Sequence, residues 1–449
     1  MTTSALSLVM APDPPHLGPY TGVGTLGAAG TRVLAGPLGR RETLAEHYER
    51  LGALSLPYTD NAREAVLGVV GASGLVGRGG AEFPMVTKLT AALRTTGVPI
   101  MVVNGSESEP ASGKDALLLR YRPHLVLDGA SLAAATVGAQ QIVVYLHEDT
   151  GATYASVIAA VRERAHLPGM PGIVVTTSAS GFVGGESSAV VSALSGGVAV
   201  PRRRSTPAAV SGIHGRPTVV SNVETLAHLG LIGRFGAGWF REAGSPAAPG
   251  STLLTLAGGV AHPGLVVEVS APVSIGTVLV DHGGLTQQPP AVLIGGYGGR
   301  WISGDAAWHA PVDRAAMRHA GVSLGCGLVA PLPPESCGLE VTVRLLDYLA
   351  SQSAGQCGSC LFGLPRLAVD LRAIAESRAT RGDVKRAHEL AQSISGRGGC
   401  AHPDGAVALL ASALEVFSAD VRRHIRGLPC GGGLAGWFPV PAAPASASA

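Results

Sequence analysis

The sequence predicts an α/β protein in which a parallel sheet is followed by a small mixed β module and a C-terminal helical bundle. The first part alternates helical patterns with short apolar runs, which is typical of buried parallel strands separated by helices. These runs are residues 100–103, 142–146 and 172–175. From residue 251 to 301 short β-rich runs are split by Gly and Pro, and from 341 to 425 the apolar residues repeat with the helical period.

The α/β domain is expected to span residues 61–245, after an N-terminal arm of residues 1–60 that contains one amphipathic helix near 41–51. Parallel strands are joined by crossover connections, which are usually helices. Residues 128–139 and 150–165 have the helical pattern and the position of such crossovers. We therefore expect a parallel sheet flanked by helices.

The mixed β module is expected to span residues 246–305, close to the lower size limit for an independent domain. Its strands are expected at 253–256, 264–269, 278–280 and 292–294. A connection of residues 306–340 leads to a helical domain of residues 341–430, and the Ala/Pro/Ser tail of 431–449 is expected to be flexible. The helices are expected at 341–350, 364–377, 383–395 and 406–425.

The composition excludes several classes of protein. The formal net charge is +2, with 46% hydrophobic and 14% charged residues, which describes a globular protein without a broad basic surface for nucleic acid or anionic lipid. No apolar stretch requires a transmembrane helix, and the N-terminus lacks the basic start and apolar core of a secretory signal. We therefore predict a cytoplasmic protein, in which six cysteines favour metal binding or buried thiols over disulfides.

A glycine-rich run followed by a lysine marks a candidate anion site. Gly77, Gly79 and Gly80 lack Cβ atoms and let backbone N–H groups approach an anion, while Arg78 and Lys88 add positive charge. Only three lysines occur in this arginine-rich chain, and two of them fall in glycine-rich motifs, where a compact ammonium suits a phosphate. The alternative is a purely structural turn before a helix.

Polar clusters follow at three further points of the α/β domain. Residues 104–110 end the strand at 100–103 with an amide and two carboxylates, at the position where open α/β sheets bind ligands. Residues 182–188 contain a Gly-Gly-Glu turn, and residues 215–225 contain an Asn and a Thr that suit a helix cap. Each cluster alone is compatible with turn or capping chemistry. Together, in this order, they favour a binding site.

Three cysteines in the helical part form a candidate metal site. Cys357 and Cys360 make a C-x-x-C pair, and Cys400 follows about forty residues later. Such thiols suggest an iron–sulfur site, and the phosphate cradle upstream then suggests electron transfer from a nucleotide donor into metal. Redox-idle or zinc-binding thiols are the alternative. Cys326 and Cys337 are expected to be ordinary small buried residues.

Five runs occur in the order found in one family: GRGGAEFPMVTKL, NGSESEPASGKDA, FVGGESSAV, GRPTVVSNVET and SAGQCGSC, the last followed by Cys400. In these runs the chain resembles the FMN- and NADH-binding flavoprotein subunit of respiratory complex I and the diaphorase subunits of bidirectional hydrogenases and NAD-linked formate dehydrogenases. The resemblance covers about Gly71 to Ile425. It implies a Rossmann-like FMN and nucleotide domain, a β-grasp (SLBB-like) module and a helical domain with an iron–sulfur site.

By this resemblance, electrons pass from NADH or NADPH through FMN to a [4Fe–4S] or [3Fe–4S] cluster, and then to a ferredoxin-like protein or another iron–sulfur subunit. We expect neither nucleic-acid binding nor direct insertion into a membrane, and any association with a membrane is expected through a partner. The implied FMN residues are Gly77, Arg78, Gly79, Gly80, Lys88, Asn104, Ser221, Asn222 and Thr225. The implied nucleotide residues are Phe83, Glu107, Glu109 and Glu186, and Glu107 is also the implied catalytic group. The implied cluster ligands are Cys357, Cys360 and Cys400.

The chain departs from the family's pattern at several positions. Ala354 stands where the family has its first cluster cysteine, which leaves three outcomes: a three-thiolate cluster with a fourth ligand from elsewhere, a [3Fe–4S] cluster, or no cluster. The candidate fourth ligands are Ser353, His402 and Cys430. Glu82 replaces a glycine, and its carboxylate is expected to crowd or repel a phosphate. Further replacements occur at Ser106, Phe182 and Ser187.

These departures motivate two alternative functions. One is a non-catalytic scaffold subunit whose nucleotide site has decayed. The other keeps FMN but runs electrons in the opposite direction, from a reduced ferredoxin to the nicotinamide nucleotide.

Overall fold

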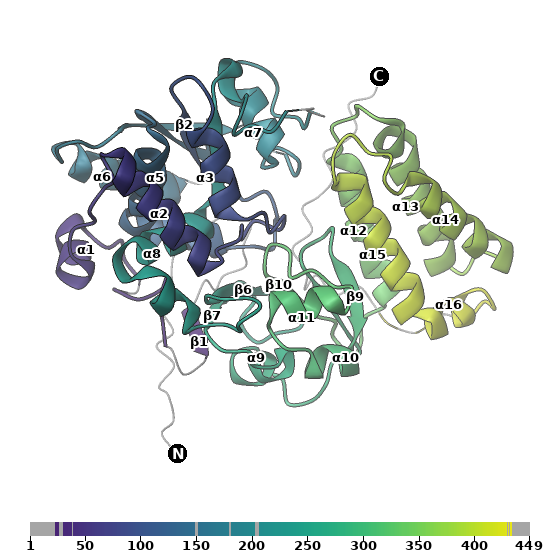
Figure 1. Cartoon of the computed structure of the whole chain (residues 1–449). Coiled ribbons are helices and arrows are strands. Elements are labelled where there is room, and N and C mark those ends of the chain that lie inside the picture. The colour runs from purple at the N-terminus through teal and green to yellow at the C-terminus, as the bar shows by residue number, and fades with distance from the viewer. Residues whose placement is uncertain are drawn as a thin grey trace.

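The computed structural model of the chain describes residues 23–26, 30–37, 39–148, 151–178, 181–202, 206–428, 430 and 432. They form two β-sheets and a C-terminal group of helices. Figure 1 shows the α/β part on one side, the helices α12 to α16 on the other, and the mixed sheet below them. The predicted fold class, an α/β domain followed by a mixed β module and a helical domain, is confirmed.

The first sheet is parallel throughout, with the strand order β4-β3-β2-β5. Its strands are β2 (Ile100–Gly105), β3 (Gln141–His147), β4 (Gly172–Ser178) and β5 (Thr218–Asn222). The three predicted strands lie within β2, β3 and β4, whereas β5 was not assigned from the sequence. Because parallel strands end at one edge, Asn104 of β2 and Asn222 of β5 lie side by side in register there.

Helices flank this sheet. They are α2 (Asp60–Ser73), α3 (Met85–Leu93), α4 (Lys114–Tyr121), α5 (Pro123–Val137), α6 (Gly151–Arg164), α7 (Ser187–Leu194) and α8 (Val223–Arg241). A 3₁₀ turn covers Ile213–Gly215. The helix α5 is buried along its whole length and packs closely against α8. A Cβ atom on Gly129 would lie 1.8 Å from the backbone oxygen of Leu226, so glycine permits this close helix approach.

The second sheet is mixed, with the strand order β1-β7-β6-β10-β8-β9. Its strands are β1 (Val23–Leu26), β6 (Thr252–Leu256), β7 (Val266–Val269), β8 (Ala291–Ile294), β9 (Arg300–Ser303) and β10 (Leu328–Pro331). Two of them come from outside the expected module of residues 246–305. The strand β10, from the expected connection, pairs with both β6 and β8 inside the sheet, and β1 from the N-terminal arm extends its edge beside β7.

One predicted strand of this module is wrong. Residues 278–280 lie in the helix α9 (Ile275–Asp281), where the side chain of Ser274 caps the helix by accepting the N–H of Thr277 at 3.0 Å. A three-residue apolar run has too little periodicity to distinguish a strand from a buried helix, and the capping serine decides for the helix. Two further short helices follow, α10 (Gly304–His309) and α11 (Arg314–His319), and their Ala307 and Met317 share one core cluster with Leu279 of α9.

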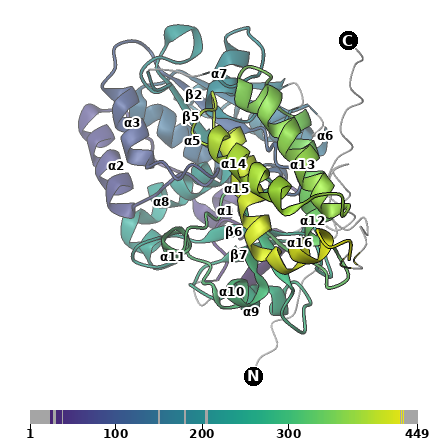
Figure 2. The same ribbon diagram turned by 90° about the vertical axis from the view of Figure 1, so that its right-hand side faces the viewer.

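The C-terminal domain is helical, as predicted, but the single helix expected at 406–425 is two helices separated at Phe417. It consists of α12 (Gly338–Ser351), a π-helical turn (Ser359–Gly363), α13 (Leu364–Ala375), α14 (Arg381–Ile394), α15 (His402–Val416) and α16 (Ser418–His424). Trp301 of β9 joins it to the mixed sheet, because its ring contacts Phe417 and its Nε1 donates to Thr342 Oγ1 at 3.0 Å. Figure 2 shows this domain facing the viewer, in front of both sheets. No helix in the described part of the chain has the length and apolarity needed to cross a bilayer.

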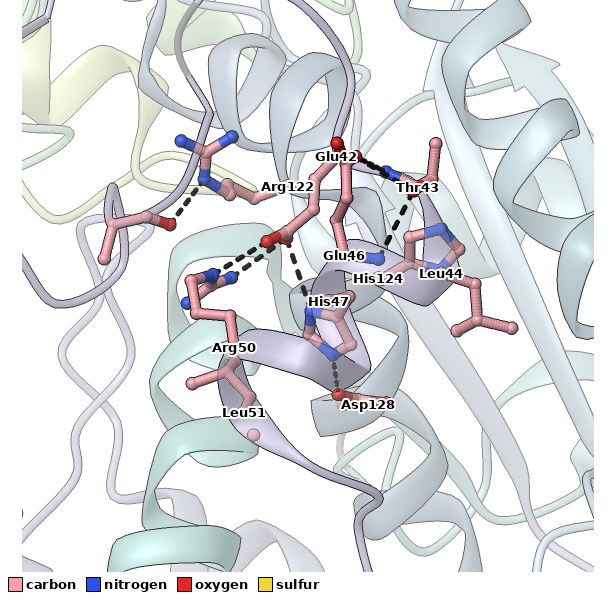
Figure 3. Close-up of polar contacts among 12 residues, drawn as sticks. Glu42, Thr43, Leu44, Glu46, His47, Arg50, Leu51, Arg122, His124 and Asp128 are labelled. Atoms are coloured by element: carbon pink, nitrogen blue, oxygen red, sulfur yellow. Dashed lines mark hydrogen bonds and ion pairs between the residues drawn. The ribbon is translucent and has the colours of Figure 1, made fainter.

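The described part of the N-terminal arm is held by buried charges, at Glu268 of β7 in the mixed sheet and at Asp128 of α5 in the α/β domain. The buried carboxylate of Glu268 accepts the backbone N–H groups of Arg32, Val33 and Leu34 at 2.9–3.0 Å. The predicted amphipathic helix is α1 (Leu44–Leu51). Its buried His47 lies between two carboxylates, as Figure 3 shows, with Nε2 2.5 Å from Asp128 of α5.

Candidate cofactor sites

The glycine-rich loop meets the start of α8 at the carboxyl edge of the parallel sheet. The backbone N–H of Gly77 donates to the oxygen of Phe83 at 2.9 Å, which closes the loop. The N–H of Arg78 donates to Thr225 Oγ1 at 2.8 Å, and a Cβ on Gly79 would lie 3.3 Å from the Cβ of Asn222. The loop is therefore packed against the residues 221–225 at a distance that bare backbone allows.

Two cations of this loop region have only backbone oxygens as described hydrogen-bond partners. Lys88 Nζ donates to the backbone oxygen of Val220 at 2.6 Å, and burial lowers the pKa of Lys88 to about 8. Arg78 is 1% exposed, donates to Pro249 O at 2.9 Å, and has a pKa lowered to about 9 by burial and then by Arg314. Among the described residues neither cation forms a salt bridge, and Arg78 Nε has no hydrogen-bond partner. A phosphate group is the kind of anion that fits this arrangement.

Glu82, expected to crowd or repel a phosphate, instead pairs with helix α11. Its carboxylate accepts from Arg314 Nη1 at 3.1 Å and also pairs with Arg318. The backbone of Glu82 has φ of +48°, a conformation that glycine adopts more easily. The ion pairs with α11 account for where the carboxylate points, and they compensate its charge.

The loop after β2 contacts the Gly-Gly-Glu turn. Asn104 Nδ2 donates to the oxygen of Gly185 at 2.8 Å, and a Cβ on Gly185 would lie only 2.6 Å from the oxygen of Ser106. The structure thus brings two of the predicted clusters, 104–110 and 182–188, into direct contact through glycine backbone.

Glu107 lies inside this loop and caps helix α4. Its carboxylate accepts the backbone N–H groups of Asp115 at 3.3 Å and Ala116 at 3.0 Å, and it also accepts from Ser112 Oγ. Burial, followed by the neighbouring Asp115, raises the pKa of Glu107 to about 7. The group that the resemblance implies as catalytic is therefore engaged in positioning its own loop.

Glu109 contacts the mixed sheet. Its Oε2 accepts the backbone N–H of Tyr297 at 2.8 Å, and a Cβ on Gly296 would lie 2.6 Å from that oxygen. Its Oε1 is buried without a hydrogen-bond partner among the described residues, and burial raises the pKa of Glu109 to about 8. The loop 295–299 is thus a part of the site that the sequence analysis missed, although its four glycines were a visible signal.

Phe83 and Glu186 lie at the surface. Phe83 is 49% exposed, and the exposed Glu186 caps α7 by accepting the N–H groups of Ser188 at 2.9 Å and Ala189 at 3.3 Å. Neither makes a described contact with Glu107 or Glu109. The four residues implied for the nucleotide are therefore split between a half-buried pair and an exposed pair.

The buried Lys114 has carboxylate partners, unlike Lys88. Its Nζ lies 2.9 Å from both Asp115 Oδ1 and Glu224 Oε2. Burial acts to lower the pKa of Lys114, but Asp115 and Glu224 raise it above its ordinary value. Glu224 also accepts the N–H of Leu253 in β6 at 3.1 Å, so this group joins the two sheets. We call Lys114, Asp115 and Glu224 the sheet junction.

The three cysteines predicted as metal ligands line one pocket. Cys357, Cys360 and Cys400 surround it together with Ala354 and His402, among other residues. A single metal ion needs ligand atoms that lie close together. In the described part of the chain, these three thiols do not form a group with all ligand atoms within 4.8 Å of one another. Three thiols around one pocket are a ligand set that suits an iron–sulfur cluster.

Burial and backbone N–H groups shift the pKa values of the thiols in this pocket. Burial acts to raise the pKa of Cys357, but the backbone N–H groups of Gly399 and Cys360 hold it below its ordinary value. Burial, and then the neighbouring Cys357, raises the pKa of Cys360 to about 12. Backbone N–H donors pointing at a sulfur are typical of cluster-binding loops, where they stabilise the negative charge of bound thiolates.

His402 is the candidate fourth ligand that the structure brings to this pocket. Its Nε2 lies 2.7 Å from the oxygen of Leu349, so Nε2 carries the proton, and Nδ1 has no hydrogen-bond partner among the described residues. Ser353 does not line the pocket, and Cys430 lies next to Cys337 and His424 instead. His402 therefore presents an unpaired lone pair from a buried ring.

The fold and these two sites define a flavin-binding α/β domain joined to an iron–sulfur helical domain. Residues 70–231 match the Nuo51 FMN-binding domain, and residues 340–424 match the NADH-ubiquinone oxidoreductase-F iron-sulfur binding region. The second F-type subunit of the NADH-quinone oxidoreductase of Rhizobium meliloti (strain 1021) is 30% identical over 382 residues, which are 82% of this chain and 90% of the relative. The F-type subunit of the same enzyme in Streptomyces coelicolor is 31% identical over 384 residues, 82% of this chain and 85% of that protein.

Solved structures show the same likeness. A chain of an NAD+-reducing [NiFe]-hydrogenase in the H2-reduced state superposes with a TM-score of 0.72 at 26% identity, covering 87% of this chain and 67% of that chain. The air-oxidised state gives a TM-score of 0.77 at 24% identity, a likeness of fold. The chain belongs to the family of F-type subunits of NADH-quinone oxidoreductase, so the resemblance seen in its motifs is confirmed.

Proposed function

We propose that this chain is a flavoprotein oxidoreductase subunit that passes electrons from NADH through FMN to an iron–sulfur cluster. The observation that supports it most is the presence in one chain of a glycine cradle with two cations that have only backbone oxygens as described hydrogen-bond partners and a pocket lined by Cys357, Cys360 and Cys400. When bound, FMN would accept a hydride from the nicotinamide and release its electrons singly to the metal. The chain's own residues bind, orient and shield these groups.

The residues proposed to hold FMN lie at one edge of the parallel sheet. The loop 77–80 would offer bare backbone N–H groups, and Lys88 and Arg78 would neutralise the phosphate. Asn104 and the residues 221–225 would supply side-chain amide and hydroxyl groups, because β2 and β5 end beside each other there. The pairing of Glu82 with α11 supports this proposal, since it removes the expected repulsion.

The four acidic and aromatic residues implied for the nucleotide are proposed in two roles. Glu107 would act by positioning, because its carboxylate caps α4 and fixes the loop that carries Glu109. Glu109 would face the nicotinamide nucleotide as a protonated acid that donates a hydrogen bond, since burial favours its neutral form. Phe83 and Glu186 would contact the nucleotide from the surface. NADH is proposed as the donor, with NADPH as an outcome of the test.

The cluster is proposed to have three thiolates and one imidazole. Nδ1 of His402 would take the coordination position that Ala354 cannot fill, because this nitrogen is buried without a described partner and the residue lines the same pocket. The hydrogen bond from Nε2 to Leu349 O would hold the ring and its tautomer, as backbone carbonyls do for metal-bound histidines.

The electron acceptor is proposed to be a ferredoxin-like protein or another iron–sulfur subunit. Leu361 and Phe362, which directly follow Cys360, are 52% and 72% exposed, so an apolar patch lies next to the cluster pocket. Such a patch suits the docking of a partner close to the metal. We also propose a cytoplasmic location, since all six cysteines are free thiols, as expected in a reducing compartment.

The first test is purification without air, followed by a visible spectrum, FMN release and NADH-driven reduction of an artificial acceptor. We expect flavin and iron–sulfur absorbance and turnover with NADH. A colourless protein that takes up no FMN and shows no turnover would support the scaffold alternative. Initial rates with NADPH, and from reduced ferredoxin to NAD+, decide the donor and the direction of flow.

The second test concerns His402. We expect His402→Ala to lower the iron count from four toward three and to give the paramagnetic resonance signal of an oxidised [3Fe–4S] cluster. His402→Cys should restore four irons with a shifted reduction potential. The control is His388→Ala, at an exposed position of α14, which should leave spectrum and potential unchanged. An unchanged signal and iron count in His402→Ala would exclude this histidine as a ligand.

A further inference from the structure

We propose that Cys337, His424 and Cys430 form a second metal site, outside the cluster pocket, that binds a single zinc-type divalent ion. One ligand atom of each residue lies within 4.8 Å of the other two, and Cys337 and His424 are each 1% exposed. In the described part of the chain this is the one group of three His, Cys, Asp or Glu residues with such spacing. Neither cysteine falls within residues 340–424, which match the family's iron–sulfur region.

The spacing suits one tetrahedral ion. Zinc bound at about 2.3 Å by sulfur and about 2.0 Å by nitrogen holds its ligand atoms roughly 3.3–3.8 Å apart. The three ligand atoms, all within 4.8 Å of one another, need only small side-chain movements to reach that geometry. Two thiolates and one imidazole are also a ligand set that zinc prefers, with a fourth position left for water or another group.

His424 is oriented as metal-bound histidines are. Its Nδ1 lies 2.6 Å from the backbone oxygen of Ala375, and because a carbonyl only accepts, Nδ1 carries the proton. The lone pair is then on Nε2, which accepts the backbone N–H of Cys430 at 3.1 Å. Nε2 thus faces the segment that carries the second cysteine, and an ion would take over this lone pair.

Cys337 has a thiol whose pKa burial raises to about 12, so it keeps its proton until an ion displaces it. It occupies the position directly before α12, and the backbone N–H groups of Glu340 and Leu339 donate to its sulfur. The positive end of a helix favours negative charge, so metal binding and deprotonation are supported together. Cys430 lies beside this sulfur, beyond the end of α16.

A bound ion would link three segments at the ends of helices in the helical domain. Cys337 precedes α12, His424 ends α16 and contacts the last residue of α13 through Ala375, and Cys430 belongs to the segment after α16. A disulfide between the two cysteines is the competing outcome. A disulfide does not need the imidazole, and the approach of an imidazole nitrogen to both sulfurs therefore favours an ion.

The experiment uses the full-length protein grown with added zinc and measures zinc, iron and FMN on the same sample. We expect about one zinc per chain, and zinc-edge X-ray absorption with two sulfur neighbours and at least one nitrogen. Cys430→Ser and His424→Gln should each reduce zinc at least fivefold while iron and FMN stay unchanged. Cys326→Ser, which changes a cysteine outside the group, should keep its zinc.

Three results would overturn the proposal. They are the absence of zinc in the wild type, full zinc retention in Cys430→Ser, and a Cys337–Cys430 disulfide in peptides from alkylated protein. If His424→Gln does not fold, Cys430→Ser still decides, because Cys430 is only partly buried and lies near the chain's end. Zinc content is read independently of flavin and iron, so a failure of the oxidoreductase function would leave this test intact.

Discussion

The sheet junction and the glycine-rich loop both carry charges withdrawn from solvent at the same edge of the parallel sheet, yet only the junction pairs them in salt bridges. Lys114 has two carboxylate partners at 2.9 Å, whereas Lys88 and Arg78 reach only backbone oxygens. A buried charge without a partner is costly. The difference indicates that the junction stabilises the fold. The cations of the loop region are available to pair with an anionic ligand.

The largest expected effect is at the junction. Lys114→Met leaves Asp115 and Glu224 buried without their cation, and we expect the free energy of unfolding to fall by roughly 3–5 kcal/mol. Urea unfolding of the FMN-free protein measures this. The control is Lys385→Met, at an exposed lysine of α14. If Lys114→Met were as stable as the wild type, the sheet junction would not stabilise the fold.

The second effect concerns the unpaired acid, Glu109. Because burial raises the pKa of Glu109 to about 8, the native state keeps a proton that the unfolded state releases above about pH 4.5. Stability from this group is therefore present at low pH and is lost as pH rises toward 8. Glu109→Gln should be free of this loss, and its stability relative to the wild type should increase by roughly 2–4 kcal/mol between pH 5 and pH 8.

Unfolding of both FMN-free proteins at several pH values checks the Glu109 prediction. Glu335→Gln, at an exposed position, is the matched control and should follow the wild type. A pH-independent difference between wild type and Glu109→Gln would mean that Glu109 is ionised in the folded protein.

The third effect separates binding from stability at the loop. Lys88→Met removes a cation whose only described partner is Val220 O, so we expect FMN affinity to fall by about 10- to 100-fold. The FMN-free protein should keep or gain stability, because a half-buried charge without a salt bridge is lost. Quenching of flavin fluorescence on binding measures the affinity. An equal loss of stability and affinity would make Lys88 structural, like Lys114.

The smallest effect is expected at Glu82. Glu82→Gln keeps a hydrogen-bonding group for Arg314 but loses the charge, and we expect a loss of roughly 1–2 kcal/mol in stability. FMN affinity should change by less than threefold, since the carboxylate is paired with α11. Glu64→Gln on the exposed face of α2 is the control. If Glu82→Gln bound FMN tenfold more tightly than the wild type, the carboxylate of Glu82 would repel the phosphate, as the sequence analysis expects.

Local patterns in the sequence were sufficient for much of this architecture. The apolar runs predict β2, β3 and β4, the C-x-x-C pair places two thiols on one turn, and the glycines 77, 79 and 80 locate the loop. Each of these signals is carried by neighbouring residues, because strand period, turn geometry and C-x-x-C spacing act over a few positions. The run at 278–280 was misassigned because it is too short to show a period.

Tertiary structure decided which charges and ligands meet. Lys114 and Glu224 are more than a hundred residues apart in the sequence. No local pattern predicts that Lys114 pairs with a carboxylate and that Lys88 does not. The same holds for the free Nδ1 of His402, which depends on a carbonyl of α12, and for the meeting of Cys337 with Cys430. The sequence alone therefore determined the family, the elements and the candidate residues. Which charged groups and ligand atoms pair with one another was decided only by the packed fold, because burial and distance set the energy of every charge and lone pair.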